Sequence, residues 1–192
     1  MAKKTGKLKD KSCKSSKNHT KEKIIARFSG DSVISSSKGA RDLYSRSFFG
    51  EYIDGKIHYS FVEALYLIGK NKIEVYDNTK KISFNLLLDK CKKVDKKIQI
   101  KYIVYKDLRD RGYLLKTALK FGADFRVYDK GAYPGKEHAK WILYPVNENS
   151  ELTWHEFSAK NRVAHSTKKN LLIAIVDSEG SIIYYEIAWI RP

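Results

Sequence analysis

Residues 171–177, LLIAIVD, form an apolar run that ends in a single carboxylate. A strand with apolar side chains on both faces is typical of a sheet that is covered on both sides, so this run predicts a central strand. A turn at 178–180 and a second β-prone run, SIIYYEIAWI (181–190), follow directly. The C-terminal part of the chain is therefore expected to contain a buried sheet with this pair of strands in it.

Two capping boxes mark the starts of helices. Ser60 precedes Glu63 by three residues, and Thr153 precedes Glu156 by the same spacing. In such a box the hydroxyl and the carboxylate satisfy N–H groups that the first helical turn leaves free. The first box predicts a short apolar helix that ends near Gly69, because glycine suits the left-handed residue after a helix.

The remaining pattern mixes strands and helices in both halves of the chain. It predicts strands at 24–28, 32–35, 73–77, 113–117, 124–129 and 138–146, a hairpin at 47–59 with Asp54-Gly55 in its turn, and helices at 84–94, 98–112 and 154–166. The fold class is therefore α/β, in the mixed α+β sense. The charge-dense residues 95–97 are the predicted boundary between an N-terminal module (24–97) and a C-terminal domain (98–192).

The charge of the chain indicates an anionic partner. Its 192 residues include 38 Lys and Arg against 22 Asp and Glu, a formal net charge of +16. Residues 1–23 hold nine lysines against Asp10 and Glu22 and almost no apolar side chain, which predicts a disordered basic tail. Such a tail binds polyphosphate without sequence preference. The alternative is a tail that serves only solubility.

Several classes of protein are excluded by what the sequence lacks. No apolar run approaches the roughly 20 residues of a membrane-spanning helix, and the lysine-rich start has no apolar core of a secretory signal. Cys13 and Cys91 give neither a disulfide framework nor the spacing of a zinc site. We expect a cytoplasmic protein without a membrane partner, a metal or a cofactor.

The usual catalytic motifs of nucleotide-binding proteins, serine hydrolases and zinc proteases are absent. What remains is a tyrosine, a histidine and several lysines and arginines around predicted strand ends and loops. These groups could serve a phosphoryl transfer that needs no metal. A metal-dependent nuclease that uses Asp124 and Glu137 is the alternative enzyme, and a non-catalytic RNA-binding or scaffold subunit is the alternative outside enzymes.

Two segments carry a resemblance to a known family. FGADFRVYDKGAYPGKEHAKWILYPV (121–146) and RVAHSTKKNLLIAIVD (162–177) resemble the catalytic domain of archaeal tRNA-splicing endonucleases. The upstream run 102–125 is similar to the helix and strand that precede it in the family, and 59–68 matches the N-terminal module more loosely. The resemblance implies a small N-terminal α/β module and a nuclease-like C-terminal domain with a central mixed sheet.

The resemblance also implies the catalytic residues. The family has a tyrosine at a strand end, a histidine after a Gly/Pro loop and a lysine before an apolar strand, which here are Tyr128, His138 and Lys169. The implied reaction excises introns from precursor tRNA at bulge-helix-bulge junctions, without metal, and leaves 2′,3′-cyclic phosphate and 5′-OH ends. Lys168 is the alternative to Lys169, and His165 is expected to support the site or to pack at a helix end.

Binding and assembly follow from the same resemblance. The family pinches a bulge base between arginines, for which Arg162 is the better candidate and Arg191 the weaker one. Three further residues are expected to line the substrate groove: Lys130, Lys140 and Trp141. Two cleavage sites require two active sites at a fixed separation, so a homotetramer is expected, or the catalytic half of a heterotetramer with a structural subunit. In that assembly 181–190 would pair between subunits and the acidic loop 147–151 would dock in a partner's pocket.

Overall fold

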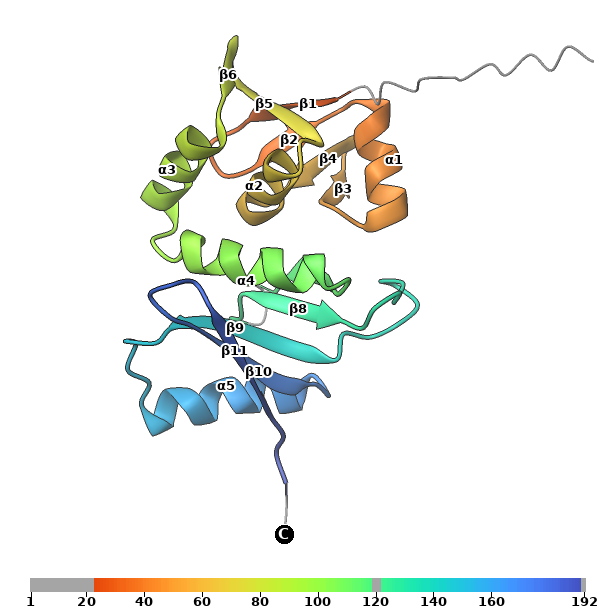
Figure 1. Cartoon of the computed structure of the whole chain (residues 1–192). Helices are drawn as coiled ribbons and strands as arrows, with labels where there is room; N and C mark the ends of the chain where they lie inside the picture. Colours follow the sequence, from red (N-terminus) through yellow and green to blue (C-terminus); the bar gives the residue numbers. More distant parts are fainter. Residues whose placement is uncertain (1–22, 119–121, 191–192) are drawn as a thin grey trace, which may run out of the picture.

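Two sheets with one long helix between them organise the chain (Figure 1). The computed structural model describes residues 23–118 and 122–190. The predicted basic tail, except for Lys23, and the candidate Arg191 lie outside the described residues. None of the helices in the described part has the length and the apolar character needed to cross a membrane.

The first sheet has six strands in the order β3-β4-β2-β1-β5-β6. The parallel pair is β1 with β5, and the other neighbours are antiparallel. Its strands and the helices connected to them are β1 (Ile24–Phe28), β2 (Val33–Ser35), α1 (Lys38–Ser47), β3 (Glu51–Ile53), β4 (Lys56–Tyr59), α2 (Phe61–Gly69), β5 (Ile73–Asp77), β6 (Lys80–Ile82) and α3 (Phe84–Val94).

The second sheet has five strands in the order β11-β10-β9-β8-β7. Helix α4 (Ile98–Asp110) covers one face and α5 (Trp154–Ser166) covers the other, as Figure 1 shows. The strands are β7 (Leu114–Thr117), β8 (Phe125–Tyr128), β9 (Trp141–Asn147), β10 (Asn170–Val176) and β11 (Ile182–Ile187). Strands β9 and β10 are parallel because α5 carries the chain back between them, and the other pairs are antiparallel.

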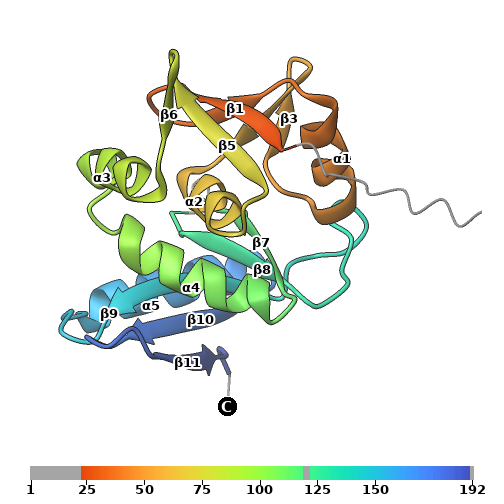
Figure 2. The ribbon, with the colours of Figure 1, turned by 45° about the horizontal axis from the view of Figure 1, so that its top comes forward.

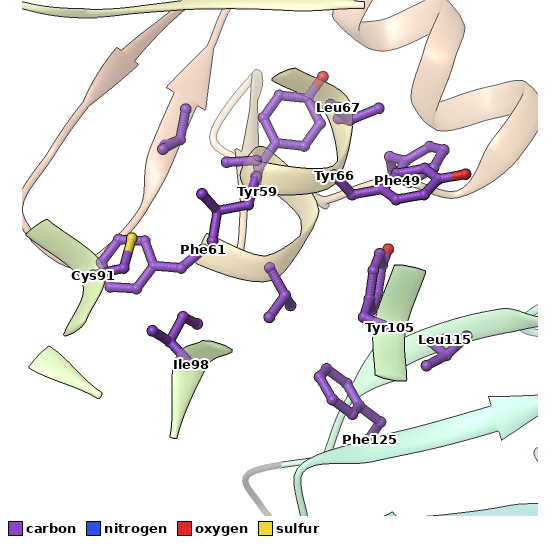
Figure 3. Close-up of a cluster of buried hydrophobic side chains, with 14 of the residues drawn as sticks. Phe49, Tyr59, Phe61, Tyr66, Leu67, Cys91, Ile98, Tyr105, Leu115 and Phe125 are labelled. Carbon is purple, nitrogen blue, oxygen red and sulfur yellow. The ribbon is translucent and has the colours of Figure 1, made fainter. Parts of the chain in front are cut away.

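The buried core is continuous from the first sheet through α4 into the second (Figure 3). A series of aromatic rings connects the two halves. Phe49 stacks on Tyr66, Tyr66 meets Tyr105 of α4 edge to face, and Tyr105 contacts Phe125 of β8, each pair with ring centroids 5.7 Å apart. Aromatic pairs in these geometries stabilise a core beyond the area that they bury. The two sheets therefore share one core.

The predicted fold class is confirmed, and so are the strands and helices apart from small shifts at their ends. Three expectations need correction. Strand β10 is not central, because β9 holds the middle position and β10 lies between it and the edge strand β11. Strand β9 begins at Trp141, so His138 lies in the preceding loop rather than in the strand. Strand β6 and helix α1 were not predicted. The start of α1 is marked by Ser37, whose side chain accepts a hydrogen bond from the N–H of Ala40.

Helix α2 ends at Gly69 as predicted, but Gly69 is not the left-handed residue after the helix. Gly69 is the last helical residue, and Asn71 takes the left-handed conformation with φ +54°. The N–H of Asn71 donates to Ile68 O and that of Lys72 donates to Leu67 O, the two bonds of a Schellman motif. Asparagine tolerates this backbone conformation better than most residues, so it can replace glycine there. Gly112 does close α4 as predicted, with φ +93°.

Candidate active site

The three predicted catalytic residues come from chain segments that meet at one edge of the second sheet, namely the side where β8 ends and β9 and β10 begin. Strand β8 is antiparallel to β9, and β9 is parallel to β10, so the end of β8 adjoins the starts of β9 and β10. Two hydrogen bonds connect these ends: the N–H of Lys140 donates to Val127 O (2.9 Å), and the N–H of Asn170 donates to Lys140 O (3.1 Å). Tyr128 and Lys169 directly adjoin these bonded residues, and His138 lies two residues before Lys140.

Tyr128 is held in a small buried cluster at the end of β8. Its side chain is 6% exposed and packs with Leu114, its partner on β7, and with Ala132 and Ala139 of the following loop. Phe48, from the end of α1, packs against this cluster. The ring of Tyr128 is therefore fixed by packing, as a group that must present its hydroxyl in one direction needs to be.

His138 is exposed and follows a tight turn in the loop 129–140. The carbonyl of Tyr133 accepts hydrogen bonds from the N–H groups of Lys136 and Glu137, both at 3.0 Å. The Glu137 carboxylate in turn accepts the N–H of Tyr133 at 3.1 Å. These three bonds close the turn directly before His138, so the imidazole is attached to an ordered piece of loop.

Lys169 is placed by the way α5 ends. The N–H of Lys168 donates to His165 O and that of Lys169 donates to Ala164 O, both at 2.9 Å, which is again a Schellman motif. Lys168 occupies its left-handed position with φ +55°, where glycine is usual. The ammonium group of Lys169 donates to Thr167 O at 2.6 Å. The motif thus gives the two adjacent lysines different roles. Lys168 adopts the left-handed backbone that ends the helix, and Lys169 is held at the sheet edge.

Arg126 also lies at this site, although it was not among the predicted residues. It lies two residues before Tyr128 on β8, so the two side chains leave the same face of the sheet. Partial burial lowers the pKa of Lys169, and the nearby positive charge of Arg126 lowers it further. The alternation along β8, which grouped Arg126 with Tyr128, was the signal that could have identified it.

Three predicted groove residues lie at the same edge. The ammonium group of Lys130 lies over the Tyr113 ring at 5.1 Å, and that of Lys140 lies over the Trp141 ring at 4.4 Å. Trp141 itself is only 9% exposed and meets Tyr113 edge to face at 5.9 Å. Its indole is therefore part of the core, whereas the two lysines are exposed.

The remaining predicted residues lie on or near α5. Arg162 is exposed in the last part of this helix, on the same helix end that leads to Lys169. His165 packs at the helix end, its ring 4.2 Å from that of Trp189 in the segment after β11.

The two acidic residues of the alternative metal-dependent site are far apart along the β8–β9 pair. Asp124 precedes β8 and pairs with Lys101 of α4 at 2.7 Å. Glu137 lies before β9, at the opposite end of the pair, and bonds within its own turn. Within residues 23–118 and 122–190 there is no group of three His, Cys, Asp or Glu side chains arranged to hold a metal ion.

Comparison with known proteins identifies a family for this chain. The family model described as tRNA intron endonuclease, N-terminal domain, matches residues 24–88, and the one described as tRNA intron endonuclease, catalytic C-terminal domain, matches residues 98–184. A tRNA-splicing endonuclease of Thermococcus onnurineus is 44% identical over 172 residues, which cover 89% of this chain and 99% of the relative. The one from Nanoarchaeum equitans is 50% identical over 137 residues, 68% of this chain and 88% of the relative. The chain therefore belongs to the tRNA intron endonuclease family.

Proposed function

We propose that this protein is a tRNA-splicing endonuclease that cuts precursor tRNA at bulge-helix-bulge junctions without a metal ion and leaves 2′,3′-cyclic phosphate and 5′-OH ends. The observation that supports the proposal is that the chain segments carrying Tyr128, His138 and Lys169 adjoin one another where β8 ends and β9 and β10 begin, in a chain of this family. In RNA the 2′-OH is adjacent to the scissile phosphate, so the attack can be internal. Such a cleavage needs a base, an acid and positive charge on the phosphorane-like transition state.

Tyr128 is the proposed general base. A phenol can accept this role where cations beside it stabilise the phenolate. Arg126 on the same face of β8 and Lys169 on the neighbouring segment are the cations proposed to do so. The buried cluster around Tyr128 keeps the phenol oriented toward the 2′-OH that it would deprotonate.

His138 is the proposed general acid for the leaving 5′ oxygen. An imidazole is a common proton donor in catalysis, and the exposed position of His138 lets it reach a bound RNA backbone. Lys169, with Arg126 behind it, is proposed to stabilise the negative charge of the transition state. Partial burial strengthens this interaction, because less water screens it.

The RNA would lie across the same edge. Lys130 and Lys140 are proposed to contact its backbone, and exposed Arg162 to hold a base that is flipped out of a bulge. Arg191 remains the second candidate for that role. We further propose that residues 24–97 and 98–192 act as the N-terminal module and the catalytic domain of a cytoplasmic enzyme.

A homotetramer, or a heterotetramer with a structural subunit, is proposed to hold two active sites at the spacing of the two bulges. Strand β11 supports this, because it is an edge strand whose Ile183 and Tyr185 are exposed. The loop 147–151 supports it less, since Glu148 already accepts the N–H of Ser178 at 2.8 Å within the same chain.

The test incubates the protein with an intron-bearing precursor tRNA in EDTA and analyses the fragment ends. We expect cleavage to persist and the 5′ fragments to end in 2′,3′-cyclic phosphate. His138→Ala should lower the single-turnover rate by roughly 10²–10⁴ with RNA binding retained. His155→Ala, at the far end of α5, is the matched control and should cleave like the wild type. Fragments that end in 3′-OH, or a wild-type rate for His138→Ala, would refute the proposed mechanism.

A further inference from the structure

The N-terminal module reaches the candidate active site through four residues, Ser47–Gly50, at the junction of α1 and β3. Figures 1 and 2 show the loop 129–140 rising from the second sheet toward the end of α1. The contact is made by Phe48, which packs against the cluster that contains Tyr128 and meets the Tyr133 ring edge to face at 4.7 Å. One side chain of the first module thus packs against the cluster that holds the proposed base and contacts the loop that carries the proposed acid.

The backbone of this segment is held from both sides. The Arg109 guanidinium donates to Ser47 O at 2.9 Å, and the ammonium group of Lys116 donates to Gly50 O at 2.6 Å. The buried carboxylate of Glu63 accepts the N–H of Gly50 at 2.9 Å. Arg109 and Lys116 belong to α4 and β7, whereas Glu63 belongs to α2, so both halves of the molecule fix the same short segment.

The two residues on the C-terminal side of Phe48 are closely packed. Phe49 is 3% exposed, and the Arg109 guanidinium lies over its ring at 3.8 Å. Gly50 has φ +77°, and a Cβ at this position would lie 2.6 Å from Ile57 Cγ2 and 2.8 Å from His58 O. Only glycine fits there, so the position of Phe48 is set by its neighbours.

Phe48 itself has an unusual backbone for its residue type. Its φ is +56° at the end of α1, a left-handed conformation in which glycine is the usual residue and a bulky side chain is uncommon. Its side chain is only partly buried, so the burial of apolar surface alone does not explain why a phenylalanine occupies this position. Strained positions of this kind persist where surrounding contacts determine them, and they concentrate at functional sites.

We propose that Phe48 is a positioning residue, which holds Tyr128 and the loop 129–140 in the arrangement that cleavage requires. The inference rests on the proposed function of that site. Phe48 touches no reacting atom in this arrangement; it acts through the packing of Tyr128 and Tyr133. Its removal should therefore reduce the cleavage rate at saturating RNA and leave RNA affinity nearly unchanged.

The test compares Phe48→Gly, Phe48→Ala and Phe48→Leu with the control Phe84→Ala. Phe84 is also a partly buried phenylalanine of the first module that contacts α4, through Tyr102 at 5.3 Å, but it lies away from the site. Glycine suits the left-handed backbone and alanine does not, so Phe48→Gly should be the more stable of the two. If Phe48 only stabilises the fold, activity will follow this order of stability. If it positions the site, both variants lose the ring and should lose the same activity.

We expect Phe48→Gly and Phe48→Ala to cleave about 10- to 100-fold more slowly in single turnover, with Kd for precursor tRNA within about threefold of the wild type. Phe48→Leu should recover most of the rate. Hydrogen exchange of the loop 129–140 in the free protein should become faster in both slow variants and stay unchanged in Phe84→Ala. A Phe48→Gly rate within twofold of the wild type, or unchanged exchange in this loop, would overturn the inference. A wild-type rate for His138→Ala would instead refute the proposed function, and the exchange measurement distinguishes the two failures because it needs no RNA.

Discussion

Helices α2 and α5 begin and end with the same local motifs, yet the protein uses them differently. Each starts with a capping box, Ser60 with Glu63 and Thr153 with Glu156, and each ends in a Schellman motif. All residues of α2 from Phe61 to Leu67 are buried, whereas α5, which is described in full, buries Ala164 and leaves its other residues at least partly exposed. The comparison shows that local motifs decide where a helix begins and ends, and tertiary packing decides its role.

The difference extends to what each motif holds in place. Glu63 is 5% exposed and bonds both to its own box and to Gly50, so the start of α2 helps to fix the segment that carries Phe48. Glu156 is exposed and bonds to Thr153 within its own box. At the other end of α5, the Schellman motif presents Lys169 to the site. Helix α2, which is buried, therefore supports the candidate site through the segment that contains Phe48. Helix α5, which is exposed, leads directly to one of the residues of the site.

In the comparison of α2 with α5, the largest expected effect is a loss of cleavage rate from a change at the end of α5. Lys169→Ala should lower the cleavage rate by about 10²–10³ in single turnover, because it removes a charge that stabilises the transition state. The lowered pKa of Lys169 means that its amine loses the proton at lower pH than an ordinary lysine, so the wild-type rate should fall early on the alkaline side. Lys169→Arg should move that fall to higher pH. An alkaline limb that stays in place in the arginine variant would contradict the role of this ammonium group.

The largest loss of stability is expected at the start of α2. Glu63→Ala should reduce the free energy of unfolding by about 2–4 kcal/mol, because it leaves the N–H groups of Gly50 and Ser60 without their acceptor in a buried place. Denaturant unfolding measures this loss, and Glu156→Ala is the matched control. Equal losses in the two variants would show that burial does not distinguish the two boxes.

A gain in stability is expected at the end of α5. Lys168→Gly should raise the free energy of unfolding by up to about 1 kcal/mol, because glycine adopts the left-handed backbone at φ +55° without the cost that a lysine bears. Asn71→Gly, the corresponding change at α2, should gain less, since asparagine already tolerates that conformation. Cleavage by Lys168→Gly should stay within about threefold of the wild type. A rate loss as large as that of Lys169→Ala would show that the two lysines had been assigned in the wrong order.

The smallest expected effect is a pH-dependent change in stability at the capping box of α5, which is exposed. Hydrogen bonds from the backbone N–H and the hydroxyl of Thr153 lower the pKa of Glu156 below its ordinary value. A carboxylate with a lowered folded-state pKa contributes stability above its unfolded pKa and loses it as the pH falls through the folded one. Glu156→Gln should therefore be slightly less stable than the wild type at neutral pH and equal to it in strong acid. A difference that persists at the lowest pH would assign the effect to something other than this charge.

The elements with local signals were predictable. Both capping boxes, the Asp54-Gly55 hairpin turn and the glycine that closes α4 lie where the sequence placed them, because each depends on a few adjacent residues. Helix α1 was missed because a serine- and glycine-rich start conceals its cap. The end of α2 near Gly69 was predicted, but the left-handed position after it is held by Asn71 and not by the glycine.

The sequence alone determined which residue types are available to the site and roughly where along the strands they lie. It could not place β9 at the centre of the second sheet, since strand order depends on pairings between residues far apart in the chain. Nor could it bring the charge of Arg126 near Lys169 or Phe48 to the Tyr128 cluster, because these relations join β8 to the end of α5 and α1 to the second sheet. Short-range hydrogen bonds form between residues that are close in the sequence, so the sequence predicts them. The geometry of the site forms only when segments that are far apart in the sequence pack against one another.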